Sequence, residues 1–338
     1  MKNIQAFGEI VIGNLEKVIV GKRATVEMVV IGLLCQGHVL IEDVPGVGKT
    51  VLARSLARSL DCAFSRIQFT PDMLPSDVTG VSIYDQSKKK FEFRPGPIMG
   101  QIVLADEINR ATPKTQAALL EAMEERQVTV DGVTHKLARP FMVLATQNPI
   151  EYEGTFPLPE AQLDRFLLRV RLGYPNISDE VRILEEQQLQ HPLDALKSVV
   201  KTKEILDAAD AIRKIFVSPQ VKRYIVDLTR RTRESDDVYL GASPRGSLGL
   251  FRSAQARAAL QGREYVLPDD VKAMAVPVLG HRIIVSPAAR LRDLGADRIV
   301  EEIMRAQPSP GGDYSSGASS KRRPATAGSG AGVKQAAK

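Results

Sequence analysis

The stretch that decides the fold runs from Val39 to Val51 and reads VLIEDVPGVGKTV. Its first three residues, Val39 to Ile41, are apolar and typical of a strand buried inside a sheet. A glycine-rich turn follows, and the chain then reads as a helix through about Leu60. This order places backbone N–H groups at the start of a helix, where an anion binds favourably.

The loop inside this stretch predicts a polyphosphate site. Gly46 and Gly48 let backbone N–H groups approach the phosphates, Lys49 adds positive charge for the β and γ oxygens, and the Thr50 hydroxyl suits Mg²⁺. The expected nucleotide-binding residues here are Asp43, Val44, Pro45, Gly46, Val47, Gly48, Lys49, Thr50 and Val51. Position 43 carries Asp where the general pattern has Gly. We expect the turn to survive, because Asp tolerates left-handed backbone better than most residues.

The rest of the first half alternates short apolar strands with helical stretches. Further strands are expected at 67–69, 102–105, 141–146 and 166–172, and Asp131-Gly132 predicts a hairpin turn. This alternation favours an α/β fold with a parallel sheet covered by helices on both faces. After Pro175 helical periodicity replaces the strand signals, with helices expected near 178–190, 201–214, 221–228, 244–261 and 268–279, so a second, all-helical domain is predicted.

Two acidic residues, Asp106 and Glu107, end the strand expected at 102–105. The carboxyl ends of parallel strands line the ligand crevice of such sheets. Asp106 is therefore expected to hold Mg²⁺ through its water shell, and Glu107 to orient or deprotonate the attacking water. Asn148 follows the next strand, where it would polarise the same water or contact the γ-phosphate, or serve only as a polar turn residue before Pro149.

Several long strings in the chain resemble the MoxR branch of the AAA+ ATPases, a family of P-loop proteins. They are FRPGP at 93–97, IVLADEINRA at 102–111, KTQ at 114–116, LLEAM at 119–123, TQNP at 146–149 and GTFPLPEAQLDRF at 154–166. The match covers about residues 18–287. The resemblance implies an α/β P-loop AAA+ module followed by an all-α lid, with ATP and Mg²⁺ as cofactors.

The resemblance also implies roles for single residues. Asn148 matches the sensor-1 position, and Arg165 matches the arginine finger, which reaches the nucleotide of a neighbouring subunit. Arg245 matches sensor 2, which would reach from the lid onto the γ-phosphate. Val20 and Gly21 match the segment that lines the adenine pocket. A guanidinium aimed at a transferring phosphoryl group neutralises developing charge, which agrees with these roles.

The expected domain organisation follows from both lines of reasoning. Residues 1–175 are expected to form the ATPase domain, with an insert at about 74–99 and a hairpin at about 127–137. Residues 176–306 are expected to form the lid, and 307–338 a disordered basic tail rich in Gly, Ser, Ala and Pro. Tyr84 and Phe91 in the insert would touch a client, or would pack locally within the insert.

The family resemblance further implies a nucleotide-dependent homohexamer, a partner with a von Willebrand factor A domain, and a protein client that is matured or loaded with metal. A motor acting on nucleic acid is the alternative, motivated by the net charge of +6. The tail, with five basic residues and one acid, holds most of that charge, so nucleic acid is an unlikely partner by composition. A non-catalytic nucleotide switch is disfavoured by Lys49, Glu107 and Arg165. No signal sequence or membrane span is expected, which predicts a cytoplasmic protein.

Overall fold

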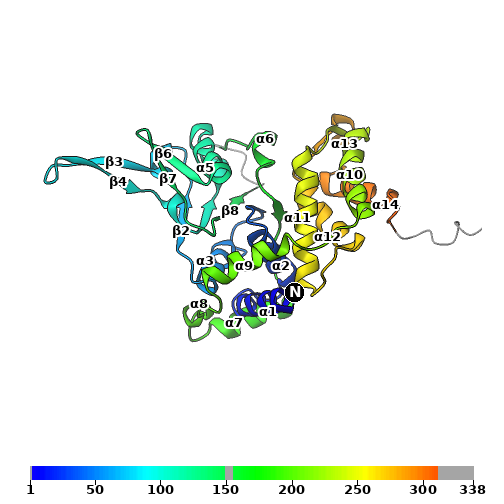
Figure 1. Ribbon diagram of the computed structural model, residues 1–338, viewed down its shortest axis with the longest axis horizontal. Coiled ribbons are helices and arrows are strands. Elements are labelled where there is room, and N and C mark those ends of the chain that lie inside the picture. The colour runs from blue at the N-terminus through cyan, green and yellow to red at the C-terminus, as the bar shows by residue number, and fades with distance from the viewer. Residues whose placement is uncertain (1, 149–154, 311–338) are drawn as a thin grey trace, which may run out of the picture.

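The computed structural model describes residues 2–148 and 155–310, and its centre is a parallel β-sheet (Figure 1). In spatial order the five strands are β2 (Phe64–Gln68), β5 (Ile102–Asp106), β8 (Met142–Gln147), β1 (Val39–Glu42) and β9 (Leu168–Val170). Each neighbouring pair is parallel. The predicted α/β fold class is confirmed, and all strand ends that were expected to carry the site lie at one edge.

The two faces of the sheet pack against different helices. In β5, Ile102 and Leu104 belong to the core cluster that includes helices on one face, whereas Val103 and Ala105 belong to the cluster on the other. The first face is covered by α1 (Lys2–Glu16), α2 (Arg23–Leu34) and α3 (Lys49–Ser59). The second is covered by α4 (Pro75–Thr79), α5 (Pro113–Glu125) and the short turns η1 (Pro97–Met99) and η2 (Ile108–Arg110). Burial on both faces explains why these strands are apolar without polar alternation.

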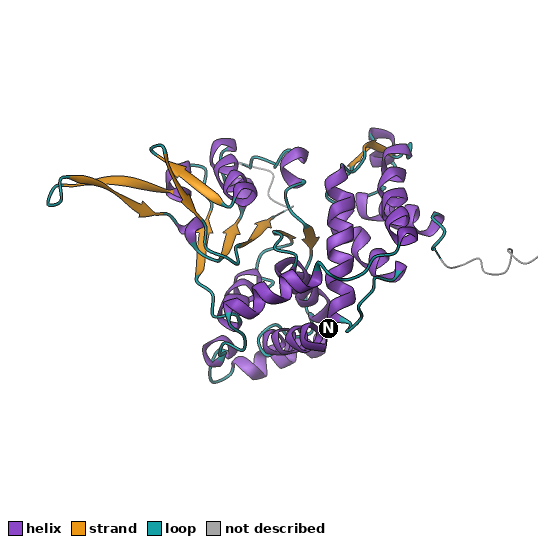
Figure 2. Cartoon of the chain, viewed as in Figure 1, coloured by secondary structure: helices purple, strands orange, loops and turns teal. Residues whose placement is uncertain are grey.

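Two antiparallel hairpins extend from the sheet domain, and Figure 2 shows them in orange, with the longer one reaching far from the body. The longer hairpin pairs β3 (Gly80–Asp85) with β4 (Lys90–Pro95) inside the predicted insert. The shorter pairs β6 (Gln127–Val130) with β7 (Val133–Lys136). Its turn residues Asp131 and Gly132 both have positive φ, as the expected tight turn requires.

The lid is mainly helical and lies on the far side of the sheet from the hairpins (Figure 1). Its helices are α10 (Pro219–Glu234), α11 (Pro244–Leu260), α12 (Pro268–Leu279), α13 (Pro287–Leu291) and α14 (Ala296–Ala306). The apolar stripe predicted at 221–228 is buried in α10. One feature was not predicted: β10 (Val238–Leu240) pairs with β11 (Ile284–Val285). Runs of two or three residues are too short to give a strand periodicity.

Three helices that lie between the sheet and the lid in the chain pack against the sheet domain. They are α7 (Ile177–Gln187), α8 (Pro192–Ala195) and α9 (Thr202–Ile212), and Figure 1 shows them beside α1 and α3. Asn14 of α1 donates to the backbone oxygen of Lys197 at 3.0 Å, and the Val199 N–H donates to Ser59 O at 2.9 Å. These contacts join segments on both sides of residue 175, so the domain boundary expected there stays a prediction. The tail beyond residue 310 lies outside the described residues.

Two predicted strands differ in extent from the observed ones. β2 begins three residues before Ile67, because Ser65 and Arg66 pair with β5 although they carry polar side chains. β9 is shorter than the 166–172 expected. The backbone oxygens of Phe166 and Leu167 accept hydrogen bonds from Arg282 of the lid, so they are not part of a sheet ladder. The short helix α6 (Glu160–Leu163) immediately precedes this segment.

The buried imidazole of His38 joins the start of β1 to the end of α5. Its Nδ1 accepts from the Val143 N–H at 3.0 Å, so Nε2, 3.0 Å from Met123 O, carries the proton. If the ring were charged, Nδ1 would carry a proton and could not accept the hydrogen bond from the Val143 N–H. Burial also disfavours the charged form and lowers the pKa of His38 to about 4. The neutral ring is therefore part of the folded structure.

This burial predicts a loss of stability in mild acid. In the unfolded chain His38 titrates with a pKa near 6.5, so its burial should lower stability by about 3 kcal/mol as the pH drops from about 6.5 to about 4. His281 is also buried with a lowered pKa and should add to this loss. Urea unfolding at pH 7, 5.5 and 4.5 measures this. His38→Gln should show a flatter pH dependence than the wild type. Equal slopes for the two proteins would contradict the burial of a neutral His38.

Candidate functional site

The predicted phosphate loop lies between β1 and α3, at the edge where the strands end. Gly46 and Gly48 have φ of 84° and 91°, in the left-handed region that favours glycine, and a Cβ atom on either would meet open space. Gly48 is the N-cap of α3, an 11-residue helix, so the first N–H groups of this helix face the loop. The Lys49 ammonium donates to Asp43 O at 2.7 Å across the loop. The loop is thus an open anion cradle.

Asp43 takes a different role from the expected one. It is not among the described residues with positive φ, so the turn does not use the left-handed tolerance of Asp. Its carboxylate instead accepts from the N–H groups of Leu172 and Gly173, both at 2.6 Å, and from Val44 N at 2.9 Å. The side chain therefore ties the phosphate loop to the connection between β9 and α7.

The acids at the end of β5 are held by neighbouring strands. Asp106 accepts from the Thr146 hydroxyl at 2.6 Å through one oxygen and from Arg66 at 2.7 Å through the other. Glu107 has left-handed φ and ψ of 56° and 48°, and its N–H donates to the same Thr146 hydroxyl at 2.8 Å. One hydroxyl of β8 thus fixes both acids.

The Glu107 carboxylate is held at its tip. Its Oε2 accepts from Gln68 of β2 at 2.8 Å and from Arg110 at 3.0 Å. Asn148 follows β8, is buried, and accepts at its backbone oxygen from Asn109 at 3.4 Å. The structure therefore gathers Lys49, Asp106 and Glu107 with Asn148 along one edge, because parallel strands all end there. Pro149 of the predicted motif lies outside the described residues.

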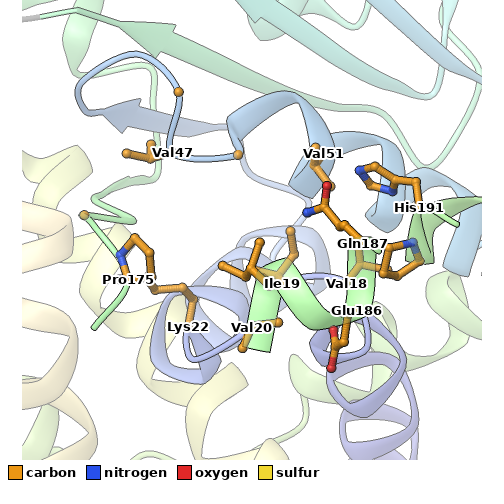
Figure 3. Close-up of a pocket in the computed structure, with 15 residues that line it drawn as sticks. Val18, Ile19, Val20, Lys22, Val47, Val51, Pro175, Glu186, Gln187 and His191 are labelled. Carbon is orange, nitrogen blue, oxygen red and sulfur yellow. The ribbon is translucent and has the colours of Figure 1, made fainter. Parts of the chain in front are cut away.

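A pocket adjoins the phosphate loop, and Figure 3 shows its lining. Of the predicted residues, it is lined by Val20, Gly46, Val47, Gly48 and Val51. Gly21 lies just outside, against Asp179 of α7, where a Cβ atom would clash with the carboxylate. Lys22 also lines the pocket, and its ammonium donates to Tyr174 O at 2.7 Å. Apolar walls next to a phosphate cradle suit a nucleobase.

Sequence reasoning missed the polar residues of this pocket. Glu186, Gln187 and His191 come from the region of α7 and α8, and Figure 3 shows Gln187 and His191 on the same side of the pocket as Val51. No motif marks these residues, and they lie about 140 positions from the loop. Thr146 was also missed as a site residue. Its polar side chain at the end of a predicted strand was a signal that could have identified it as one.

Arg165 and Arg245 do not join the phosphate loop of their own chain. Arg165 Nε lies 3.0 Å from Glu124 Oε2, and Arg245 of α11 forms an ion pair with the other oxygen of Glu124. Glu124 follows Met123, whose carbonyl contacts His38 immediately before β1. The Leu167 N–H donates to His38 O at 2.8 Å, which brings the Arg165 segment to the same place.

These contacts put both arginines at the edge where the strands begin. The phosphate loop and the acids lie at the opposite edge, and β1 alone, with its four residues, spans about 13 Å. The expectation that Arg245 reaches from the lid onto a γ-phosphate therefore does not fit the loop of the same chain. The structure brings Arg245 together with Arg165 instead, around one carboxylate.

The described residues contain no group of three or more His, Cys, Asp or Glu side chains arranged to hold a metal ion. Within residues 2–148 and 155–310, no helix has both the length and the apolar character needed to cross a membrane.

Comparisons with known proteins agree with this architecture. Residues 38–168 match the ATPase family associated with various cellular activities (AAA), and residues 230–303 match the AAA lid domain. The uncharacterized protein YeaC of Bacillus subtilis is 52% identical, over 88% of this chain and 93% of its own length. Chaperone MoxR1 of Mycobacterium tuberculosis is 39% identical, over 88% and 81%. The crystal structure of a putative ATPase from Cytophaga hutchinsonii aligns with a TM-score of 0.84 at 39% identity, over 90% of this chain and 96% of that one.

Proposed function

This chain belongs to the MoxR family of AAA+ ATPases and hydrolyses ATP, and from that premise we propose that it works as a homohexameric ring that remodels a protein client. The observation that carries the ring is the separation of Arg165 and Arg245 from the phosphate loop of the same chain. A closed ring with head-to-tail contacts puts the beginning edge of one sheet against the ending edge of the next. Each nucleotide then receives its arginines from the neighbour.

In this proposal the residues of the ending edge divide the work on ATP. The loop Asp43–Val51 binds the phosphates, and the pocket beside Val20 holds the base. Thr50 and Asp106 would hold Mg²⁺, which neutralises charge on the β and γ oxygens. Asp106 would do so through water, because both of its oxygens already accept hydrogen bonds.

Glu107 acts on the attacking water, and Asn148 helps to orient it. The neighbour's Arg165 neutralises charge that develops on the γ-phosphate, and its Arg245 assists there. The contact of Glu107 with Gln68 holds the carboxylate toward β2, and this contact would have to yield before the carboxylate serves the water. The ring would form only with nucleotide, since the phosphates are what the neighbour's arginines bind.

The long hairpin β3–β4 is proposed to act on the client. Near its tip, Phe91 is 72% exposed and Tyr84 is 49% exposed, with the two rings in edge contact at 5.3 Å. Exposed aromatic side chains of this kind are suited to binding another protein. Packing of these rings only against each other would not account for their exposure to solvent.

A protein client is favoured over nucleic acid by the charges at the same tip. Lys88 pairs with Glu92 at 2.7 Å and with Asp85 at 3.7 Å, and Lys90 also pairs with Glu92 at 3.5 Å. A surface that tracks a phosphate backbone keeps its cations free for phosphates. The resemblance to Chaperone MoxR1 supports chaperone-like work. A partner with a von Willebrand factor A domain, maturation or metal insertion in the client, and a cytoplasmic location complete the proposal.

Rings that hold ATP without hydrolysing it test the partners. Glu107→Gln rings purified from the source cell should retain a client and a von Willebrand factor A domain protein, and the further change Phe91→Ser should release the client alone. In a separate experiment with wild-type rings, added DNA should leave the ATPase rate unchanged at low and high salt, because the aromatic tip binds protein. A rate that rises with DNA and falls steeply with salt would favour the nucleic-acid motor instead.

A further inference from the structure

The segment that carries Arg165 is held by the lid of the same chain. Arg282, just after α12, has a side chain that is 3% exposed. Its Nε donates to Asp164 Oδ1 at 2.8 Å, and its other nitrogens donate to Phe166 O at 2.5 Å and Leu167 O at 3.2 Å. One buried guanidinium therefore binds residues on both sides of Arg165.

Two further lid residues contact the same segment. His281 Nε2 lies 3.0 Å from Phe166 O, and the Ser243 hydroxyl donates to Asp164 Oδ2 at 2.8 Å. Ser243 also caps α11, where it accepts from the N–H of Arg245 at 3.1 Å. The lid thus fixes the backbone next to Arg165 and the start of the helix that carries Arg245. Both arginines depend on one cluster of contacts, which we call the Arg282 clamp: Asp164, Ser243, His281 and Arg282.

Joining two domains through a buried guanidinium requires removing its charge from water, which opposes folding. Burial lowers the pKa of Arg282 even though Asp164 opposes the shift, which shows that the charge is poorly solvated. Apolar residues of similar volume often join surfaces at least as stably. A guanidinium, unlike an apolar side chain, fixes direction through its planar fork of donors. Arg165 itself is 29% exposed on its side chain and is held by Glu124, so its aim depends on the backbone beneath it.

We propose that the Arg282–Asp164 pair is a positioning device that couples the lid of each subunit to the arginines it offers to the next subunit's ATP. When the lid turns, Arg282 carries the segment 164–167 with it, and Arg165 moves relative to the neighbouring γ-phosphate. The position of the lid in one subunit thereby sets the hydrolysis rate in the next. This inference rests on the proposed function, because it needs arginines that act across the subunit boundary.

Weakening the clamp should lower turnover without weakening ATP binding. Arg282→Lys keeps the charge but loses the fork, and Asp164→Asn keeps the shape but loses the charge. We expect kcat to fall roughly 10- to 100-fold in each, since a displacement of about 1 Å at a reacting centre can cost on the order of 100-fold. The KM for ATP and the affinity for a fluorescent ATP analogue should stay unchanged. Arg263→Lys, which alters an Arg–Asp pair confined to the lid, should keep the wild-type kcat.

Mixed rings separate positioning from general damage. Rings that combine Asp164→Asn with Glu107→Gln subunits should regain activity, because Glu107→Gln subunits offer intact arginines to intact ATP sites. Rings that combine Asp164→Asn with Arg165→Ala subunits should show no such recovery, since neither subunit offers a correctly placed Arg165. Two outcomes would overturn the clamp. The first is a wild-type kcat in Asp164→Asn. The second is that rings of Asp164→Asn and Glu107→Gln subunits regain no activity, although rings of Arg165→Ala and Glu107→Gln subunits do. If Arg165→Ala also fails to recover, the proposed function fails first. Should Arg282→Lys not fold, Asp164→Asn alone decides.

Discussion

Glu107→Gln is expected to stop ATP hydrolysis while ATP stays bound. The change removes a carboxylate that can take a proton from water, and a group of this kind contributes on the order of 100-fold or more to a rate. Thr146 fixes the backbone of Glu107 at 2.8 Å, and Gln68 holds the carboxylate tip at 2.8 Å, so the substitution should alter chemistry more than position. Phosphate release and filter binding of labelled ATP measure the two effects separately.

Lys49→Ala supplies the contrasting control for this experiment. The ammonium crosses the phosphate loop to Asp43 O at 2.7 Å and is proposed to bind the β and γ oxygens. Its removal should abolish ATP binding, and hydrolysis should be lost as a consequence. A Glu107→Gln protein that hydrolyses ATP at the wild-type rate would show that another residue activates the water. A Glu107→Gln protein that no longer binds ATP would assign Glu107 to the binding of the nucleotide.

The ending edge of the sheet could be predicted from sequence because its signals are local. Val39–Thr50 carries strand, turn and helix in one stretch, and Asp106 and Glu107 directly follow an apolar run. The topology then brings the two stretches together, since parallel strands share one edge. The confirmed fold class follows from the same local periodicities.

The contacts that complete the site could not be predicted in this way, because they join residues far apart in the chain. Gln187 and His191 reach the pocket beside the phosphate loop through the packing of α7 and α8, and nothing in their sequence neighbourhood marks them. From sequence, Glu124 is one of several acids on the exposed face of α5, yet it binds both arginines. The family resemblance implied roles for Arg165 and Arg245, but it did not predict that both would bind Glu124.

Asp43 illustrates how a departure from a motif can be misread. Conformational tolerance explained how Asp might replace Gly in the turn, but the backbone there does not have positive φ. The carboxylate instead binds Leu172 and Gly173, at the start of the connection to α7. A residue of the phosphate loop thus binds the connection to α7, a helix that lines the pocket beside that loop. A single sequence shows the departure but not the distant N–H groups that use it.

Arg165→Ala is expected to lower ATPase activity by about 1,000-fold in assembled rings, the scale of effect seen when an arginine finger is lost. ATP should still bind, because the phosphate loop lies at the opposite edge of the sheet from the pair formed with Glu124. Turnover by steady-state phosphate release, in rings verified by light scattering, measures the loss. The wild-type activity per subunit should also rise with protein concentration as rings form. Full activity in a monomer would contradict an arginine supplied by a neighbour.

The decisive form of this experiment mixes two inactive proteins. In rings assembled from equal amounts of Arg165→Ala and Glu107→Gln subunits, about a quarter of the sites combine an intact Glu107 with an intact neighbouring Arg165, because each boundary joins unlike edges. Activity should therefore return to about a quarter of the wild-type value. Arg245→Ala should recover with Glu107→Gln in the same way, but not with Arg165→Ala. If Arg245→Ala recovered with Arg165→Ala and not with Glu107→Gln, Arg245 would serve its own subunit's ATP, and the ion pair with Glu124 would have to open for the lid to deliver it there.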